Sequence, residues 1–189
     1  MATRNHTKLI VDLLELYGED PNREGLKETP ERVLRMYKEL LGGYQQDPSS
    51  VIKTFEGNGH NDLVTVSDID FYSLCEHHMI PFFGKVHIGY IPNGRILGLS
   101  KFVRLTEIYA RRLQVQERLT RQIMDAIETN LHPQGAIVHV EAEHLCMVMR
   151  GVKKKGAITK TTALCGDFEK DPLLVDRFFR HINRSDNSK

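Results

Sequence analysis

The chain has 189 residues, of which 40% are apolar and 27% charged, and its formal net charge is +1. At roughly 100–200 residues per domain this length predicts a single structural unit, and the composition excludes a disordered chain or a fibrous repeat. The near-zero charge excludes a global attraction to nucleic acid or anionic lipid, so any anion site must be local. No apolar run approaches the ~18 residues of a membrane span, and the N-terminus lacks the pattern of a secretory signal, so a cytoplasmic location is expected.

The first part of the chain predicts two helices. Apolar residues repeat at three- and four-residue spacing over residues 6–17. Thr29 followed by Pro30 is typical of a helix start, and this second helix is expected to run to Gly42. We therefore expect an N-terminal helical segment over residues 1–45.

The rest of the chain predicts an α+β fold with an antiparallel sheet, in one domain over residues 46–183. Two consecutive helices separate two groups of strands, and residues 184–189 resemble a frayed tail. The expected elements are strands at 63–75 and 84–92, a helix from Lys101 capped by Ser100, a helix from Val115 or Gln116 to about His132, strands within 135–151 and 159–168, and a final helix at 174–182.

The strongest chemical signal is Cys75-Glu76-His77-His78, because a Cys-x2-His spacing can fold a thiolate and an imidazole around one ion. In the later strand, His144 and Cys146 are two residues apart and so should share a face, and the same parity would bring Arg150 onto it.

Two thiolates and one imidazole, from Cys75, Cys146 and His78, are ligands that zinc prefers, and three protein ligands leave a fourth position for water. A structural site that takes a fourth ligand from Cys165, His77 or His144 is an alternative, and a disulfide between Cys75 and Cys146 is a third interpretation. In the first interpretation His77 and His144 are not ligands, and they are candidate proton carriers near neutral pH.

Two further groups suggest a nucleotide. With Ser100 as a cap, Lys101 and Arg104 lie in the first turn of a helix and form a local anion site, although such cations are often only a solvated face. Gln116 and Glu117 begin the next helix, and a carboxylate can accept two parallel hydrogen bonds from the N–H edge of guanine. Favourable placement of Glu117 at a helix start is the structural alternative.

Five segments together resemble the GTP cyclohydrolase I family, in its minimal bacterial type. They extend from about Gly18 to Phe168, and the pairing of CEHH with a distant HxC is the most specific feature. The segments are GEDPNREGLKETPERV, SLCEHHMIPFFGKVHIGYIP, GLSKFVRL, RRLQVQERLT and AEHLCMVMRG.

The resemblance implies a tunnelling fold, in which an antiparallel sheet carries two helices on one face after N-terminal helices. It also implies a cytoplasmic homodecamer of two five-membered rings, with sites shared between subunits. The implied reaction is zinc-dependent hydrolysis and rearrangement of GTP to 7,8-dihydroneopterin triphosphate and formate, the first step of folate and tetrahydropterin biosynthesis. The alternatives are another tunnelling-fold enzyme of pterin or deazapurine chemistry, and a non-catalytic, zinc-stabilised assembly that binds guanine nucleotides.

The resemblance also assigns residues. One Zn2+ per subunit would be held by Cys75, His78 and Cys146. The implied catalytic residues are His77 and His144, which transfer protons, and Ser100, near the ribose. The implied substrate contacts are Glu117 and Gln116 at guanine, Lys101, Arg104, Arg150, Arg32 and Arg35 at the triphosphate, and Leu99 nearby. Arg35 stands where some relatives have lysine, which keeps the charge but alters the geometry.

Overall fold

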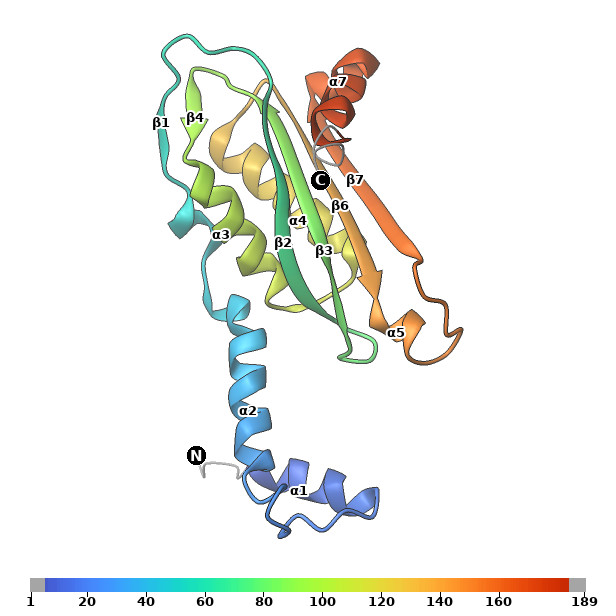
Figure 1. Cartoon of the computed structure of the whole chain (residues 1–189). Helices are drawn as coiled ribbons and strands as arrows, with labels where there is room; N and C mark the ends of the chain where they lie inside the picture. Colours follow the sequence, from blue (N-terminus) through green and yellow to red (C-terminus); the bar gives the residue numbers. More distant parts are fainter. Residues whose placement is uncertain (1–5, 184–189) are drawn as a thin grey trace. The chain divides into compact units, whose positions relative to one another are not determined.

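The computed structural model describes residues 6–183, and the chain divides into one unit that ends at Gly42 and another that begins at Gly43 (Figure 1). The first unit holds α1 (Thr7–Leu16) and α2 (Thr29–Leu40), close to the two predicted helices. The predicted segment boundary between residues 45 and 46 remains a prediction and lies close to this division. The predicted tail falls outside the described residues.

The second unit is built on a five-stranded sheet with the order β5-β2-β3-β6-β7. All its neighbouring strands are antiparallel except β5, which pairs in parallel with the end of β2. In the pairing of β3 with β6, Phe82 lies opposite His144, so the start of one strand meets the end of the other. The strands are β2 (Val64–Cys75), β3 (Pro81–Ile91), β5 (Leu113–Gln114), β6 (Gly135–His144) and β7 (Ile158–Gly166).

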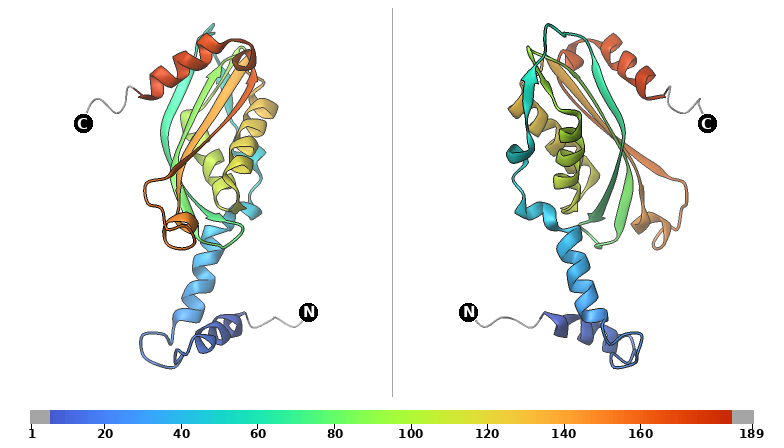
Figure 2. Two further views of the ribbon diagram at one scale, coloured as in Figure 1. Left: turned by 90° about the vertical axis from the view of Figure 1, so that its right-hand side faces the viewer. Right: turned by 60° about the vertical axis from the view of Figure 1, so that its left-hand side comes forward.

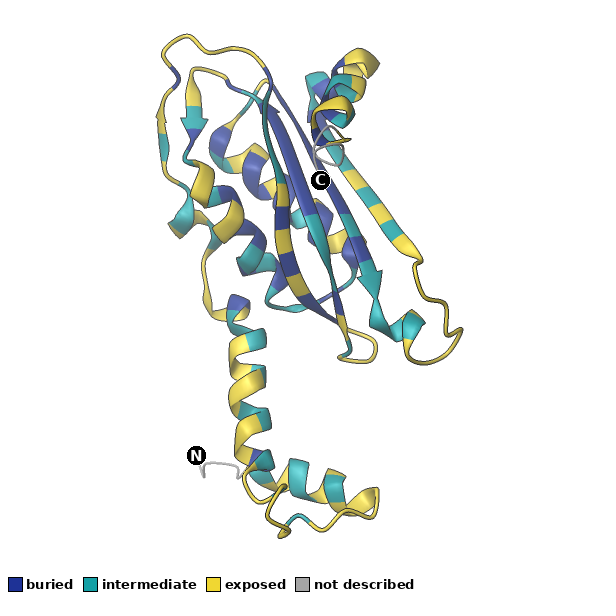
Figure 3. Cartoon of the chain, in the orientation of Figure 1, coloured by how far each residue is buried: buried dark blue, intermediate teal, exposed yellow. Residues whose placement is uncertain are grey.

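Two helices, α3 (Leu99–Ala110) and α4 (Gln116–Leu131), cover one face of this sheet, and α7 (Pro172–Asn183) lies on the other face (Figure 2). The main core forms between the sheet and the helices α3 and α4, where alternate strand residues are buried (Figure 3). This arrangement confirms the predicted α+β fold, in which the sheet carries two helices on one face as the tunnelling fold implied by the resemblance requires.

Several short elements were not predicted. Between α2 and β2 the chain forms two 3-10 helices and a strand, and that strand pairs with β4 in a separate two-stranded sheet. Two or three residues per strand are too few to give an alternating pattern. These elements are η1 (Gly42–Gln45), η2 (Pro48–Val51), β1 (Thr54–Glu56), β4 (Arg95–Leu97) and α6 (Asp167–Lys170).

The predicted helix cap at Ser100 is wrong. The helix begins at Leu99 with Gly98 as its N-cap, and Lys101 N–H donates to the carbonyl oxygen of Gly98. Ser100 is therefore already inside the first turn, because the extended backbone that precedes the helix ends at Gly98.

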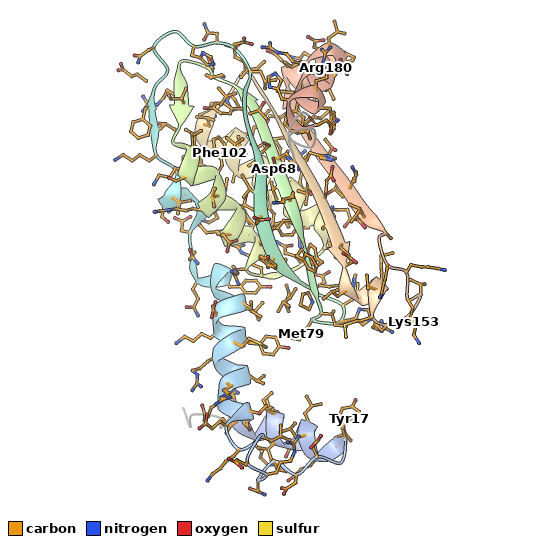
Figure 4. The ribbon with its side chains drawn as sticks, in the orientation of Figure 1. Tyr17, Asp68, Met79, Phe102, Lys153 and Arg180 are labelled. Carbon is orange, nitrogen blue, oxygen red and sulfur yellow. The ribbon has the colours of Figure 1, made fainter. Side chains whose placement is uncertain are left out.

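Phe102 on α3 joins this helix to the sheet (Figure 4). Its side chain is fully buried, and its ring centroid lies 5.5 Å from that of Tyr90 on β3. We expect Phe102→Ala to lower the free energy of unfolding by about 3–5 kcal/mol, because it removes a large apolar group and leaves a cavity. Denaturant unfolding of this variant and of the exposed neighbour Val103→Ala tests the expectation, and equal losses in the two variants would contradict it.

A bulge in β2 brings a backbone N–H against a buried histidine on the face that carries α7. Asp68 has a φ of 58°, and its N–H donates to Nδ1 of His87, 3.2 Å away. His139 lies beside His87, with ring centroids 6.1 Å apart. Burial lowers the pKa of both histidines from the ordinary 6.5.

This burial predicts a loss of stability on acidification. A histidine with a lowered pKa in the folded state binds protons more readily when unfolded, so the free energy of unfolding falls as the pH drops through 6.5. We expect His87→Gln, which keeps an acceptor but does not titrate, to flatten the decline of melting temperature between about pH 7.5 and about pH 5.5. The exposed His60→Gln is the control. If the melting temperature of His87→Gln declined as steeply as that of the wild type, the loss of stability could not be attributed to protonation of His87.

Within residues 6–183, no helix is both long enough and apolar enough to cross a membrane.

Candidate metal centre and nucleotide site

The turn between β2 and β3 presents the first two predicted ligands. Cys75 ends β2, its N–H donates to the carbonyl oxygen of Ile80, and its own carbonyl accepts from the N–H of Met79. Met79 lies in this turn (Figure 4) and adopts a left-handed backbone with a φ of 54°, which lets the chain turn back directly after His78. The Cys-x2-His spacing is therefore folded as a tight turn, as its pattern predicted.

The third ligand comes from the end of β6, but not by strand parity. The strand ends at His144, and Cys146 lies in the short helix α5 (Leu145–Val148). The prediction that His144, Cys146 and Arg150 share one strand face is therefore wrong. Arg150 lies beyond the end of this helix, and its guanidinium contacts His78 rather than sharing a strand face with His144.

The structure brings Cys75, His78 and Cys146 together, with their ligand atoms all within 4.8 Å of one another. Burial and the neighbouring Cys75 raise the pKa of the Cys146 thiol, so two adjacent thiolates are unfavourable without a cation between them. Two thiols and one imidazole at this distance are a donor set that fits zinc. All three cysteines are free, which disfavours the disulfide interpretation.

Two other polar side chains surround this group. Arg150 Nη1 donates to Nε2 of His78, 2.6 Å away, which shows that this imidazole nitrogen presents its lone pair toward a cationic group. Nδ1 of His77 lies 3.7 Å from Sγ of Cys75. A cation, a second imidazole and the three ligand side chains therefore meet at one end of the sheet.

His144 ends β6, two residues before Cys146, and contacts the start of α4. Its ring stacks on Phe82 with centroids 4.6 Å apart and planes within 4°, and its Nε2 lies 2.8 Å from Oε1 of Gln116. Burial lowers the pKa of His144, and the nearby charge of Glu117 opposes that shift. A neutral imidazole held in one orientation is suited to proton transfer.

Glu117 is exposed at the first turn of α4 and lines a recess of about 440 Å³ between this helix and β7. Thr161 and Arg121 line the same recess. Its volume lies in the range of small-ligand sites. Gln116, one residue earlier, points inward and is only 1% exposed. The predicted contacts of Glu117 and Gln116 with guanine remain predictions.

The cationic residues predicted for the triphosphate lie in several elements. Lys101 and the exposed Arg104 are in the first turns of α3, and neither has an ion-pair partner among residues 6–183. Leu99 is exposed at the start of the same helix. In the N-terminal unit, Arg32 pairs with Glu28 at 2.6 Å and Arg35 is exposed on α2.

Sequence reasoning missed Phe82 and Arg118. Phe82 stacks on His144, and Arg118 pairs with Glu76 in the turn that holds the ligands. The alternation of β3 could have placed Phe82 on the buried face, whereas the pairing of Arg118 depends on β5, which has no sequence signal of its own.

Comparison with known proteins gives one consistent result. The family model for GTP cyclohydrolase I matches residues 6–183. The chain is 52% identical over 177 residues to GTP cyclohydrolase 1 of Chlorobaculum tepidum, a match that covers 93% of this chain and 79% of the relative. It is 54% identical over 175 residues to GTP cyclohydrolase 1 of Dehalococcoides mccartyi strain CBDB1, covering 92% and 93%. The corresponding protein of Halalkalibacterium halodurans is 53% identical, with 90% and 93% covered.

Proposed function

The chain belongs to the GTP cyclohydrolase I family, and on that premise we propose that it converts GTP and water into 7,8-dihydroneopterin triphosphate and formate. The observation that carries the proposal is the convergence of Cys75, His78 and Cys146, from two distant segments, within 4.8 Å. These residues would hold one zinc ion per subunit. When bound, zinc supplies Lewis-acid activation of water for attack at C8 of the purine.

The protein's own groups perform the remaining tasks. Glu117 binds guanine by accepting hydrogen bonds from N1–H and the 2-amino group. Gln116 lies beside it. His144 and His77 take up and return protons as the imidazole ring of the purine opens and C8 leaves as formate. Ser100, in the first turn of α3, contacts the ribose, which opens and rearranges before the new ring closes.

The triphosphate is bound by cationic side chains rather than by a glycine-rich loop. Lys101 and Arg104 lack ion-pair partners within residues 6–183, which leaves their charges available for phosphate oxygens. Leu99 provides an apolar contact beside them. The remaining phosphate ligands in this proposal are Arg150, Arg32 and Arg35.

The working form in this proposal is a cytoplasmic homodecamer of two five-membered rings whose sites take residues from neighbouring subunits. The sheet edge supports such an assembly, because among residues 6–183 the outer edge of β7 has no strand beside it and can pair with a strand of another copy. Light scattering should give ten times the 21.7 kDa chain mass. A monomer that is fully active would contradict shared sites.

One assay tests the activity. Purified zinc-loaded protein is incubated with GTP, and formate is measured together with the fluorescent pterin that appears after oxidation. We expect both products, and we expect a zinc chelator to suppress both. Binding of GTP without turnover would instead favour a non-catalytic assembly protein.

A further inference from the structure

Gln116 lies at the first position of α4 and is almost completely buried, with 1% of its surface exposed. Its side-chain amide contacts β6, β7 and the imidazole of His144. A buried amide must satisfy both its donors and its acceptor, so its hydrogen bonds determine how it is oriented.

Three acceptors surround the nitrogen of this amide. Nε2 donates toward the carbonyl oxygens of Val140 and Thr159, each 3.0 Å away, and toward Oγ1 of Thr161 at 3.2 Å. If the amide were reversed, its oxygen would face two carbonyl oxygens that cannot donate. The orientation is therefore fixed, and Oε1 is the atom directed at His144.

Two threonine hydroxyls complete the network in one direction. Thr120 Oγ1 donates to the main-chain carbonyl of Gln116 at 2.8 Å, which uses its single proton. Thr161 Oγ1, 2.6 Å from Thr120 Oγ1, must then donate to it and can only accept from Gln116. The hydrogens of both hydroxyls are therefore assigned, and neither hydroxyl can donate to the Gln116 amide and so stabilise the reversed amide, which would direct an N–H at His144.

Because Oε1 only accepts, Nε2 of His144 must carry a hydrogen. We propose that Gln116 is a positioning residue that holds His144 in the neutral tautomer protonated on Nε2, so that Nδ1 is the nitrogen that exchanges protons during the reaction. Among residues 6–183, Nδ1 of His144 has no protein hydrogen-bond partner. The ring stack on Phe82 holds the plane of the same imidazole.

The role of Gln116 in turnover rests on the proposed function, in which His144 carries protons. When Nδ1 takes a proton, the imidazolium has both nitrogens protonated, and its Nε2–H bond to Oε1 becomes charge-assisted. The proton then leaves from Nδ1 and the neutral tautomer returns, so the cycle balances. Gln116 stabilises both forms of His144 without giving or taking a proton itself.

The first test reads the tautomer directly in the zinc-loaded protein labelled with 15N-histidine. Solid-state 15N NMR of the wild type, with the His144 signals identified by their absence in His144→Ala, should show Nε2 protonated and Nδ1 unprotonated. A hydrogen on Nδ1 instead would overturn the proposal. This measurement needs neither turnover nor a Gln116 variant, so it is decisive even if the proposed activity is absent or the variant does not fold.

The second test uses Gln116→Met, which keeps the length of the side chain but removes the acceptor. We expect kcat for formate release to fall by about 10–100-fold, as for other partners that orient a functional histidine, with KM for GTP changed less than about 2-fold. The His144 signals should then show both tautomers.

The matched control is Gln114→Met, because Gln114 is an equally buried glutamine whose amide nitrogen donates to Tyr109 and Gln122 and whose amide oxygen accepts from Arg118 rather than from a histidine. It should lose stability but keep kcat within about 2-fold of the wild type. An equal fall of kcat in both variants would show a general packing effect and contradict the proposal. A rise of KM at unchanged kcat in Gln116→Met would instead make Gln116 a guanine contact.

Discussion

Replacing Cys146 by serine is expected to remove tightly bound zinc and to lower formate release by more than about 1,000-fold. The thiolate of Cys146 is one of the three protein donors that lie within 4.8 Å of one another at this site, and a serine hydroxyl is a much weaker zinc ligand. The loss follows from the chemistry of the site, because water has a pKa far above neutral unless a cation activates it. Metal analysis and the formate assay on the same preparation measure both effects, and His78→Ala should behave in the same way.

Two other variants separate ligand loss from general damage. Cys165→Ala removes a thiol that is 5% exposed in the core, so it should keep one zinc per subunit and its activity. His144→Ala should slow proton transfer but keep zinc bound, since His144 bonds to Gln116. Normal turnover in Cys146→Ser would refute the metal assignment, and zinc loss in His144→Ala would make His144 a ligand.

Replacing Glu117 by glutamine is expected to lower kcat/KM for GTP by at least about 100-fold, because two charge-assisted hydrogen bonds to guanine are lost or weakened. The exposed carboxylate at the start of α4 can accept from both N1–H and the 2-amino group, whereas an amide can accept from only one and directs its own N–H at the other. Steady-state kinetics with GTP and with inosine triphosphate, which lacks the 2-amino group, measure the effect.

The preference for GTP over inosine triphosphate should fall in Glu117→Gln, since the analogue avoids the clash between two N–H donors. Glu128→Gln, an exposed carboxylate farther along the same helix, is the control and should leave both substrates unaffected. If Glu117→Gln retained the full preference for GTP, guanine would be bound elsewhere.

The local part of the metal site could be predicted from the sequence, because Cys75 and His78 are close along the chain and a tight turn brings their side chains together. Cys146 was identified by residue type, but the strand parity that was expected to align it with His144 fails where β6 gives way to α5. Such a change from strand to helix depends on tertiary contacts that alternation cannot show.

The network around Gln116 could not be predicted at all. Its partners lie on β6 and β7, and their register against α4 is set by the packing of the whole sheet. In the sequence, Gln116 next to Glu117 suggests a second polar group for guanine, whereas burial directs its amide to His144. The prediction of a helix cap at Ser100 was wrong for a simpler reason, since a glycine such as Gly98 can also end an extended segment and begin a helix.

The most direct test of the account follows the carbon that the reaction removes. GTP carrying 13C at C8 is incubated with the zinc-loaded protein, and 13C NMR follows the label while the oxidised pterin is measured by fluorescence. The account predicts that all consumed label appears as formate, in a one-to-one ratio with pterin. Label that remains in the purine while GTP is consumed, with release of inorganic phosphate, would contradict it.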